Sequence, residues 1–267
     1  MPKFSVITPI HLWNTSRVRS FLNTIESVRG QTFKDFEWII VDDGSTVDFI
    51  WALALGAHSN VSIIKKTHEE RVIAYNQAFK VAKGEWFVLL DSDDEMTPDA
   101  LAEMDQVIRE NEKFKMFNFG CLYHHLDGGK SSRDPFEPKM LKVGHESFGG
   151  GNIVNGTFIW HREVYEKLGG YGPRDTDGHI IGIDTSSINY GGVRDLFIGS
   201  PYDFAAWFLL EFPEQQEHFF VNHEAEPDKI IKEIGNPWGQ DHALFYKYTR
   251  KYHSKPVKKY LYIVHPR

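Results

Sequence analysis

Three aspartates follow a strand-like apolar run in the first half of the sequence. Asp91, Asp93 and Asp94 come directly after the segment EWFVLL at 85–90. In an extended chain, side chains two residues apart point the same way, so Asp91 and Asp93 can converge on one cation. Asp94 then points elsewhere or turns with the chain. Two carboxylates suit a hard cation that keeps water ligands and shares phosphate oxygens with a substrate.

Four kinds of site or surface could carry this acidic cluster. A solvated turn needs no function. A calcium loop needs Gly at its sixth position and Glu at its twelfth, where this chain has Met96 and Ala102, so we reject it. A phosphatase of the haloacid dehalogenase type starts from D-x-D-x-T, and Glu95 replaces the threonine. A nucleotide-sugar transferase would use a metal on the carboxylates to stabilise a leaving diphosphate.

Alternating strands and helices should position the cluster. The hydrophobic patterns predict four strands and, between them and after them, four helices. The strands are expected at 4–9, 37–46, 61–66 and 85–90, and the helices at 15–30, near 47–57, at 71–84 and at 97–111. This alternation predicts a mostly parallel sheet whose ligands bind beyond the carboxyl ends of the strands. Thr8 and Pro9, the DDGS segment at 42–45 and the DSDD segment at 91–94 should therefore lie side by side.

The second half of the sequence is less regular. Strands are expected at 115–125 and 258–265, a strand with a short helix at 156–172, and a final helix at 239–252. The insert 172–236 shows weak periodicity and receives no assignment. We expect one domain over residues 1–267, with a nucleotide-sugar-binding half at 1–110 and an acceptor-binding half at 111–267 that includes this insert.

Composition narrows the class of protein. The net charge of -7 argues against a nucleic-acid partner. No apolar run approaches the roughly 20 residues of a membrane helix, and the single cysteine, Cys121, fits a reducing compartment. We expect a soluble, cytoplasmic protein. The segment 240–267 is rich in Lys and Arg, which favours either a solvated helix face or a basic flank that contacts phosphates or an anionic membrane surface.

Four motifs in this order carry a resemblance to a known family. FSVITP, SVRGQTFKDFEWIIVDDGST, AYNQAFKVAKGEWFVLLDSDD and TPDAL are similar to the inverting family 2 glycosyltransferases of the GT-A fold, over residues 3 to about 105. The likeness resumes more loosely at 156–172 and 238–248. It implies a Rossmann-like, mostly parallel sheet flanked by helices, with a large insertion before the C-terminal helix. It also implies that a hexosyl or N-acetylhexosaminyl group is transferred from a UDP- or dTDP-sugar to an acceptor hydroxyl, with Mn²⁺ or Mg²⁺.

The resemblance assigns roles on the donor side. Thr8 and Pro9 would line the nucleotide, and the Asp43 carboxylate would accept a hydrogen bond from an N–H of uracil or thymine. In the D-x-D motif, Asp91 would lie near the ribose or the metal, and Asp93 would be the main metal ligand. Asp94 would contribute to nucleotide-sugar binding.

Two further residues are assigned to the donor side. The family often has ARN where this chain has AYN at 74–76, so one expected cation is missing. Arg71, one helical turn earlier, would replace it, unless it is an ordinary exposed arginine at a helix start. His265 lies where relatives often have a histidine after the final strand, and would approach the metal or the diphosphate, although a surface histidine is the simpler alternative.

The resemblance also assigns the catalytic base. An inverting enzyme needs a carboxylate that takes the proton of the acceptor hydroxyl. The matching residue is Asp241 in WGQDHALF, where Gln240 replaces the usual Glu, although Asp241 could also serve as a helix N-cap. The insert 172–236 separates it from the preceding glycine pair and contains three other candidates for the base, Asp184, Asp195 and Asp203. The acceptor is expected to be a carbohydrate or glycoconjugate, and a catalytically inactive nucleotide-sugar or glycan-binding protein is the non-enzyme alternative.

Overall fold

A computed structural model describes residues 1–47, 60–68, 71–135, 155–171, 244, 248 and 252–266. The chain divides into two compact units. The first, which we call the sheet unit, comprises Met1–Glu137, Val154–Val164 and Tyr252–Arg267, and the second comprises Pro138–Ile153 and Tyr165–Lys251. Most described residues belong to the sheet unit, and the fold below is that of this unit. The predicted boundary at residue 110 stays a prediction.

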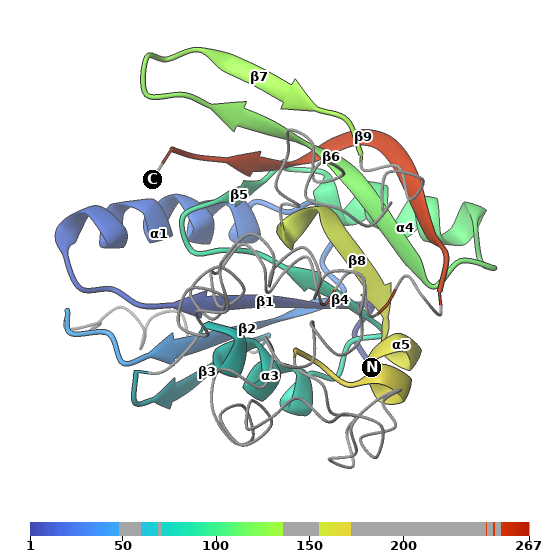
Figure 1. Cartoon of the computed structure of the whole chain (residues 1–267), viewed down its shortest axis with the longest axis horizontal. Helices are drawn as coiled ribbons and strands as arrows, with labels where there is room; N and C mark the ends of the chain where they lie inside the picture. Colours follow the sequence, from blue (N-terminus) through green and yellow to red (C-terminus); the bar gives the residue numbers. More distant parts are fainter. Residues whose placement is uncertain are drawn as a thin grey trace, which may run out of the picture. The chain divides into compact units, whose positions relative to one another are not determined.

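Nine strands of the described chain form one sheet in the order β3-β2-β1-β4-β8-β6-β9-β5, with β7 paired to β6 (Figure 1). The strands are β1 (Phe4–Ile10), β2 (Phe36–Asp43), β3 (Val61–Lys66), β4 (Trp86–Leu89), β5 (Glu95–Met96), β6 (Met116–His124), β7 (Lys130–Arg133), β8 (Phe158–His161) and β9 (Ser254–Val264). The first four pair in parallel, as the alternation of strands and helices predicts. The predicted α/β fold class is confirmed.

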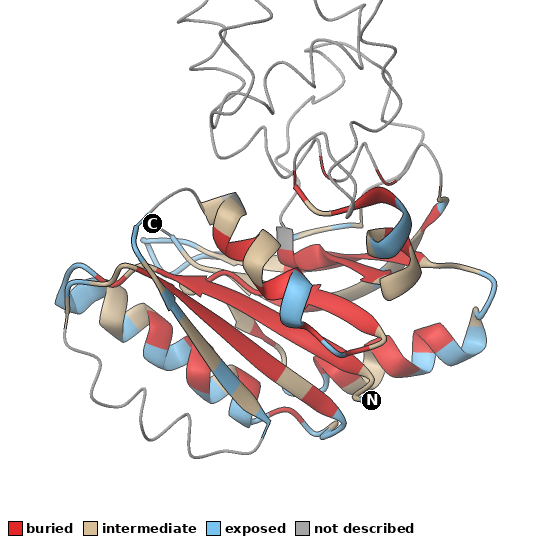
Figure 2. Cartoon of the chain, turned by 90° about the horizontal axis from the view of Figure 1, so that it is seen from below, coloured by how far each residue is buried: buried red, intermediate tan, exposed pale blue. Residues whose placement is uncertain are grey.

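Strands β1, β2 and β4 are buried almost throughout because helices cover both faces of the sheet (Figure 2). Helix α1 (Thr15–Arg29) packs Phe21 against Trp38, and helix α3 (Arg71–Val81) packs Phe79 against Phe87. Trp38 pairs with Val6, whereas Phe87 pairs with Ser5. Consecutive residues of a strand point to opposite faces, so α1 and α3 lie on opposite sides of the sheet.

The second half of the sheet is mixed. Strand β8 is antiparallel to β4 and β6, while β9 runs parallel to β6 and antiparallel to the short strand β5. The β5–β9 pairing sets Glu95 opposite Ile263 and Met96 opposite Tyr262. The end of the described chain is thereby brought next to the acidic segment 91–94. No local sequence pattern indicates that these two segments are neighbours.

Three further helical segments complete the described structure. They are α4 (Ala100–Glu110), the 3-10 turn η3 (Asn155–Thr157) and α5 (Arg162–Leu168), which is followed by Gly169 with a φ of 71°. In the predicted final helix, Leu244 and Tyr248 are described, and both are helical and buried. The insert 172–236 and residues 48–57 lie outside the described residues. No described helix is both long and apolar enough to cross a bilayer.

Candidate active site

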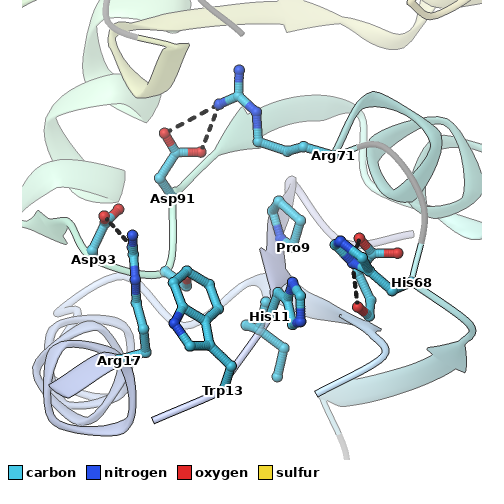
Figure 3. A pocket seen from close by; sticks show the side chains of 11 residues that line it. Pro9, His11, Trp13, Arg17, His68, Arg71, Asp91 and Asp93 are labelled. Atoms are coloured by element: carbon cyan, nitrogen blue, oxygen red, sulfur yellow. Dashed lines mark hydrogen bonds and ion pairs between the residues drawn. The ribbon is translucent and has the colours of Figure 1, made fainter. Parts of the chain in front are cut away.

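A pocket opens at the carboxyl ends of β1, β2 and β4 (Figure 3). Its lining includes Pro9 at the end of β1, Asp43 at the end of β2, and Asp91 and Asp93 after β4. In the strand order β3-β2-β1-β4, the chain switches from one side of β1 to the other between β3 and β4. Ligands of open α/β sheets bind at such switch points, beyond the carboxyl ends of the strands.

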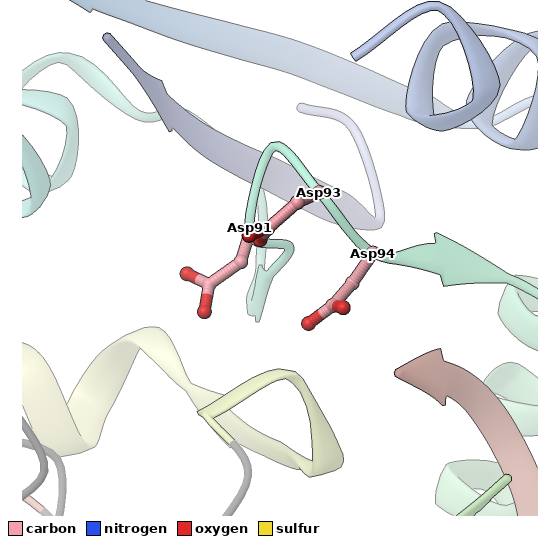
Figure 4. Close-up of side chains that lie close together, drawn as sticks. All are labelled: Asp91, Asp93 and Asp94. Atoms are coloured by element: carbon pink, nitrogen blue, oxygen red, sulfur yellow. The ribbon is translucent and has the colours of Figure 1, made fainter. Parts of the chain in front are cut away.

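The acidic segment after β4 is a tight turn. The backbone N–H of Asp94 donates to the carbonyl of Asp91 at 3.1 Å, so the segment is not extended. As a result, Asp94 turns back toward its neighbours. Asp91, Asp93 and Asp94 each offer an oxygen atom, and these oxygens lie within 4.8 Å of one another (Figure 4). All three carboxylates therefore converge, and not only the two that a strand geometry would bring together.

Asp91 is held by side chains of α3 and β9. The Tyr75 hydroxyl donates to Asp91 Oδ1 at 2.7 Å, and Arg71 Nη1 lies 3.4 Å from both carboxylate oxygens. The backbone N–H of Asp91 donates to the Tyr262 hydroxyl at 3.0 Å. Arg71, which the resemblance suggests as a replacement for the cation missing from the AYN segment, and Tyr75 therefore contact the same carboxylate.

Asp93 and Asp94 have different partners. Arg17 Nη1 donates to Asp93 Oδ2 at 2.9 Å, and the backbone N–H of His265 donates to Asp94 Oδ1 at 3.1 Å. The imidazole of His265 instead pairs with Glu95, with Nε2 2.6 Å from Oε1. His265 therefore reaches the acidic turn through its backbone.

Asp43 forms a buried ion pair with a lysine from the neighbouring strand. Asp43 pairs with Lys66 in the β2–β3 register, and the ammonium group contacts Asp43 Oδ1. The two side chains are only 6% and 7% exposed. On the other oxygen, His68 Nδ1 lies 3.0 Å from Asp43 Oδ2.

The turn after β2 requires a glycine. Asp42 Oδ1 accepts a hydrogen bond from the Ser45 N–H at 2.9 Å, and Gly44 has a φ of 71°, in the left-handed region. A Cβ at Gly44 would lie 2.6 Å from the backbone N of His68. The DDGS segment therefore both forms the turn and lets His68 approach Asp43.

Thr8 and Pro9 behave differently although they are adjacent. Pro9 lines the pocket. Thr8 is fully buried, and its hydroxyl accepts a hydrogen bond from Trp38 Nε1 at 3.0 Å. The structure therefore brings Pro9, but not the Thr8 side chain, together with the other predicted residues.

Two ionisable groups near the site have altered pKa values. Burial, reinforced by the carboxylates of Asp94 and Asp91, raises the pKa of Tyr262 well above its ordinary value, so this hydroxyl stays neutral beside the acidic turn. Burial and the neighbouring His68 lower the pKa of His11, whose ring centroid lies 3.9 Å from that of His68. The His11 imidazole, which lines the pocket, is therefore uncharged at neutral pH.

Sequence reasoning missed several residues of the site, namely Arg17, Lys66, His68, Tyr75 and Tyr262. Lys66 and Tyr75 carried detectable signals, because one ends a predicted parallel strand beside that of Asp43 and the other occupies a motif position. No sequence signal marks Arg17 or Tyr262, because the contact of Arg17 depends on the angle of helix α1 and that of Tyr262 on the β5–β9 pairing.

The predicted base, Asp241, lies outside the described residues, as do Asp184, Asp195 and Asp203. In the second unit, the Tyr248 hydroxyl donates to the carbonyl of Gly169 at 2.7 Å, and Tyr248 is completely buried. Tyr248, which falls in the predicted final helix, is therefore tied to Gly169, the first residue of the glycine pair that the resemblance places before the base.

The acidic turn fits a hard divalent cation. Carboxylate oxygens are the ligands that Mg²⁺ and Mn²⁺ prefer, and three such groups within 4.8 Å leave positions for water or phosphate oxygens. Asp91, Asp93 and Asp94 would hold the cation.

Comparison with known proteins identifies the family. The family model described as glycosyl transferase family 2 matches residues 5–169. The chain therefore belongs to glycosyl transferase family 2, in agreement with the predicted GT-A fold class, and this membership argues against the phosphatase alternative.

Individual relatives agree with this assignment. An uncharacterized glycosyltransferase of Rickettsia conorii is 34% identical over 57% of this chain and 23% of its own length. Glycosyltransferase GlyG of Streptococcus pneumoniae is 30% identical over 46% of this chain and 41% of its own length. The chain thus spans less than half the length of these two relatives.

Among solved structures, S. aureus TarS 1–349 in complex with UDP-GlcNAc is 20% identical, with a TM-score of 0.45 over 62% of this chain and 47% of that one.

Proposed function

We propose that this protein is a metal-dependent, inverting glycosyltransferase that moves a sugar from a UDP- or dTDP-sugar to an acceptor hydroxyl. The observation that carries the proposal is the convergence of Asp91, Asp93 and Asp94 beside Asp43 at the switch point of the sheet, in a chain of glycosyl transferase family 2. The transferred group would be a hexosyl or N-acetylhexosaminyl residue.

The Asp43 end of the pocket suits a diketo pyrimidine base. A carboxylate oxygen accepts more than one hydrogen bond, so Asp43 can receive the N–H of uracil or thymine while it keeps Lys66 and His68. The rings of His11 and Trp13, whose centroids lie 5.1 Å apart, offer faces on which a base can stack. A base with a carbonyl at the matching edge would be repelled.

The acidic end of the pocket suits the diphosphate. Bound Mg²⁺ or Mn²⁺ would supply positive charge that stabilises the leaving diphosphate. Asp93 would be the main ligand of the cation, with Asp94 and Asp91 beside it, and Asp91 could instead serve the ribose. Arg71 and Tyr75 orient the Asp91 carboxylate, while the backbone of His265 orients that of Asp94.

Asp241 is the proposed catalytic base. It would take the proton of the acceptor hydroxyl while that oxygen attacks the anomeric carbon, and the bond from that carbon to the diphosphate would break with its electron pair on the diphosphate. This role comes from the family motif. The helical, buried Leu244 and Tyr248 agree with a helix that starts near Asp241, where a carboxylate stays ionised.

We further propose a cytoplasmic enzyme with a carbohydrate or glycoconjugate acceptor. Peripheral contact with a membrane surface is compatible with the many lysines and arginines of the segment 240–267.

A donor screen tests the proposed function. The purified protein is incubated with UDP-glucose, UDP-GlcNAc, UDP-galactose and dTDP-glucose, with Mn²⁺ or with EDTA, and release of UDP or dTDP is measured. The proposal expects slow, metal-dependent release from at least one donor, and an Asp241→Asn variant that binds the same donor but no longer turns it over.

Three other results would point elsewhere. Release of phosphate from phosphomonoesters would support the phosphatase alternative. Binding of a nucleotide sugar without turnover across a panel of acceptors would support an inactive binding protein. An Asp241→Asn variant with nearly normal turnover would move the base to Asp184, Asp195 or Asp203.

A further inference from the structure

We propose that Arg17 is a diphosphate-binding residue that exchanges partners, pairing with Asp93 in the free protein and with the donor diphosphate once a divalent cation binds Asp93. The inference rests on the proposed function and adds to it a residue that the family motifs do not mark. The contact that carries it is the 2.9 Å ion pair between Arg17 Nη1 and Asp93 Oδ2, at the edge of the pocket (Figure 3).

The first turn of α1 directs Arg17 into the pocket. Asn14 caps the helix by accepting a hydrogen bond from the Arg17 N–H at 2.9 Å, which fixes the backbone of Arg17 as the third helical residue. The guanidinium group lies 4.6 Å from the centre of the Trp13 ring. Trp13 also lines the pocket, so this cation–π contact holds the charge there independently of Asp93.

The ion pair between Arg17 and Asp93 should weaken when a metal binds Asp93. The Asp93 side chain is 11% exposed and the Arg17 side chain 32% exposed, so their ion pair is only partly desolvated and is modest in strength. A divalent cation on any oxygen of Asp93 lies within a few ångströms of the guanidinium group and repels it. Arg17 therefore competes with the cation for Asp93.

A bound diphosphate offers Arg17 a better partner. The planar guanidinium group matches two phosphate oxygens at once, and such charge-assisted pairs are stronger than contacts with a carboxylate already shared with a metal. Arg71 lies across the acidic turn on α3 and pairs with Asp91. The two arginines thus flank the turn, and each is within reach of a diphosphate held above it.

The exchange makes two predictions of opposite sign for Arg17→Gln. Without nucleotide, loss of the competing charge should tighten Mn²⁺ binding by roughly threefold to tenfold. With saturating Mn²⁺, loss of the diphosphate contact should weaken UDP binding by roughly tenfold. A residue that only stabilises the turn would weaken both.

Arg19 provides a matched control on the same helix. It is exposed and is not among the residues that line the pocket. Arg19→Gln removes the same formal charge, so it corrects for long-range electrostatics. Arg17→Lys keeps the charge but loses the planar fork, and should weaken UDP binding less than Arg17→Gln does.

The experiment measures Mn²⁺ binding by electron paramagnetic resonance and UDP binding by calorimetry, on wild type and the three variants. Thermal unfolding verifies that each is folded, and Arg17→Met, which also removes the charge, replaces Arg17→Gln if the latter is not. The inference is supported if Arg17→Gln binds Mn²⁺ more tightly and UDP more weakly than Arg19→Gln. It is overturned if the two variants are alike, or if Mn²⁺ affinity is unchanged. If wild type binds neither Mn²⁺ nor UDP, the proposed function fails and this inference with it.

Discussion

The negative charges of two acidic regions in one pocket are balanced in different ways. At the end of β2, Asp43 is paired with Lys66, and both side chains are buried. After β4, three carboxylates converge. Among the described residues, two arginines pair with them at the edge of the turn, Arg17 with Asp93 and Arg71 with Asp91. Among the described residues, the Asp43–Lys66 pair is neutral, whereas the turn has three carboxylates and two arginines.

The difference indicates which ligand each region takes. A carboxylate balanced by a buried lysine keeps its geometry and suits a neutral ligand that donates N–H groups, such as a base. Three close carboxylates repel one another, and a divalent cation relieves this repulsion. The two regions should therefore fail in different ways when they are mutated, one in base recognition and the other in metal dependence.

The largest expected effect is at the second region. Asp93→Asn should lower turnover with a nucleotide sugar by at least roughly 100-fold, because the variant loses a charged ligand of the cation. UDP binding measured in EDTA should change by less than threefold. Release of UDP from the nucleotide sugar tests the first expectation and calorimetry in EDTA the second. An equal loss of UDP affinity in EDTA would show that the two regions are not separate.

The next effect is at the first region. Asp43→Asn removes the carboxylate that pairs with the buried Lys66, which should cost about 3 kcal/mol of the free energy of unfolding. It should also weaken UDP binding roughly tenfold and leave Mn²⁺ binding unchanged. The double variant Asp43→Asn with Lys66→Met removes both charges and should recover most of the stability but none of the UDP affinity. Recovery of UDP affinity as well would mean that Asp43 does not contact the base.

A smaller effect should follow from the turn that supports Asp43. Gly44→Ala places a Cβ 2.6 Å from the His68 backbone at a φ of 71°, and should cost about 2 kcal/mol in the free energy of unfolding, with weaker UDP binding. Gly128→Ala is the matched control, because its φ is 80° but nothing lies within 4 Å of the new Cβ. It should cost only about 1 kcal/mol and leave UDP binding intact. Equal effects would exclude the His68 contact as a cause.

The smallest expected effect lies outside both regions and sets the background for pH experiments. Burial and the nearby Lys115 lower the pKa of His161 from 6.5, and its Nδ1 accepts a hydrogen bond from the Glu163 N–H at 3.2 Å. The unfolded chain therefore binds the proton more readily. The contribution of His161 to stability is complete above pH 6.5 and falls as the pH is lowered toward its folded pKa.

Thermal unfolding checks this pH dependence. The midpoint should fall by no more than about 4 °C between pH 7.5 and 5.5 through this group. His161→Asn, which keeps a hydrogen-bond acceptor but cannot be charged, should show a smaller fall. An identical fall would assign the pH dependence to other groups.

The first half of the fold was predictable because each element carries its own signal. The strand expected at 61–66 is observed at Val61–Lys66, and the helix expected at 15–30 is observed at Thr15–Arg29 with Asn14 as its cap. Long apolar runs and capping residues determine such elements locally. The side-by-side strand ends then follow from the parallel order of the sheet.

The rest of the site depends on contacts between distant segments. The assumption of an extended chain brought Asp91 and Asp93 together and left open whether Asp94 turns with the chain, as it does in the structure. The contact of Tyr262 with Asp91 joins residues 171 positions apart through the β5–β9 pairing. No local pattern predicts such a pairing, because the sequence of a strand does not determine which distant strand it pairs with.

The central claim is that the acidic turn couples a divalent cation to nucleotide binding at Asp43. Calorimetric titration of UDP into the wild-type protein, with saturating Mn²⁺ and with EDTA, tests it most directly. We predict that Mn²⁺ tightens UDP binding at least roughly tenfold in wild type and has no effect in Asp93→Asn. Equal UDP affinities in Mn²⁺ and EDTA for the wild-type protein would contradict the claim.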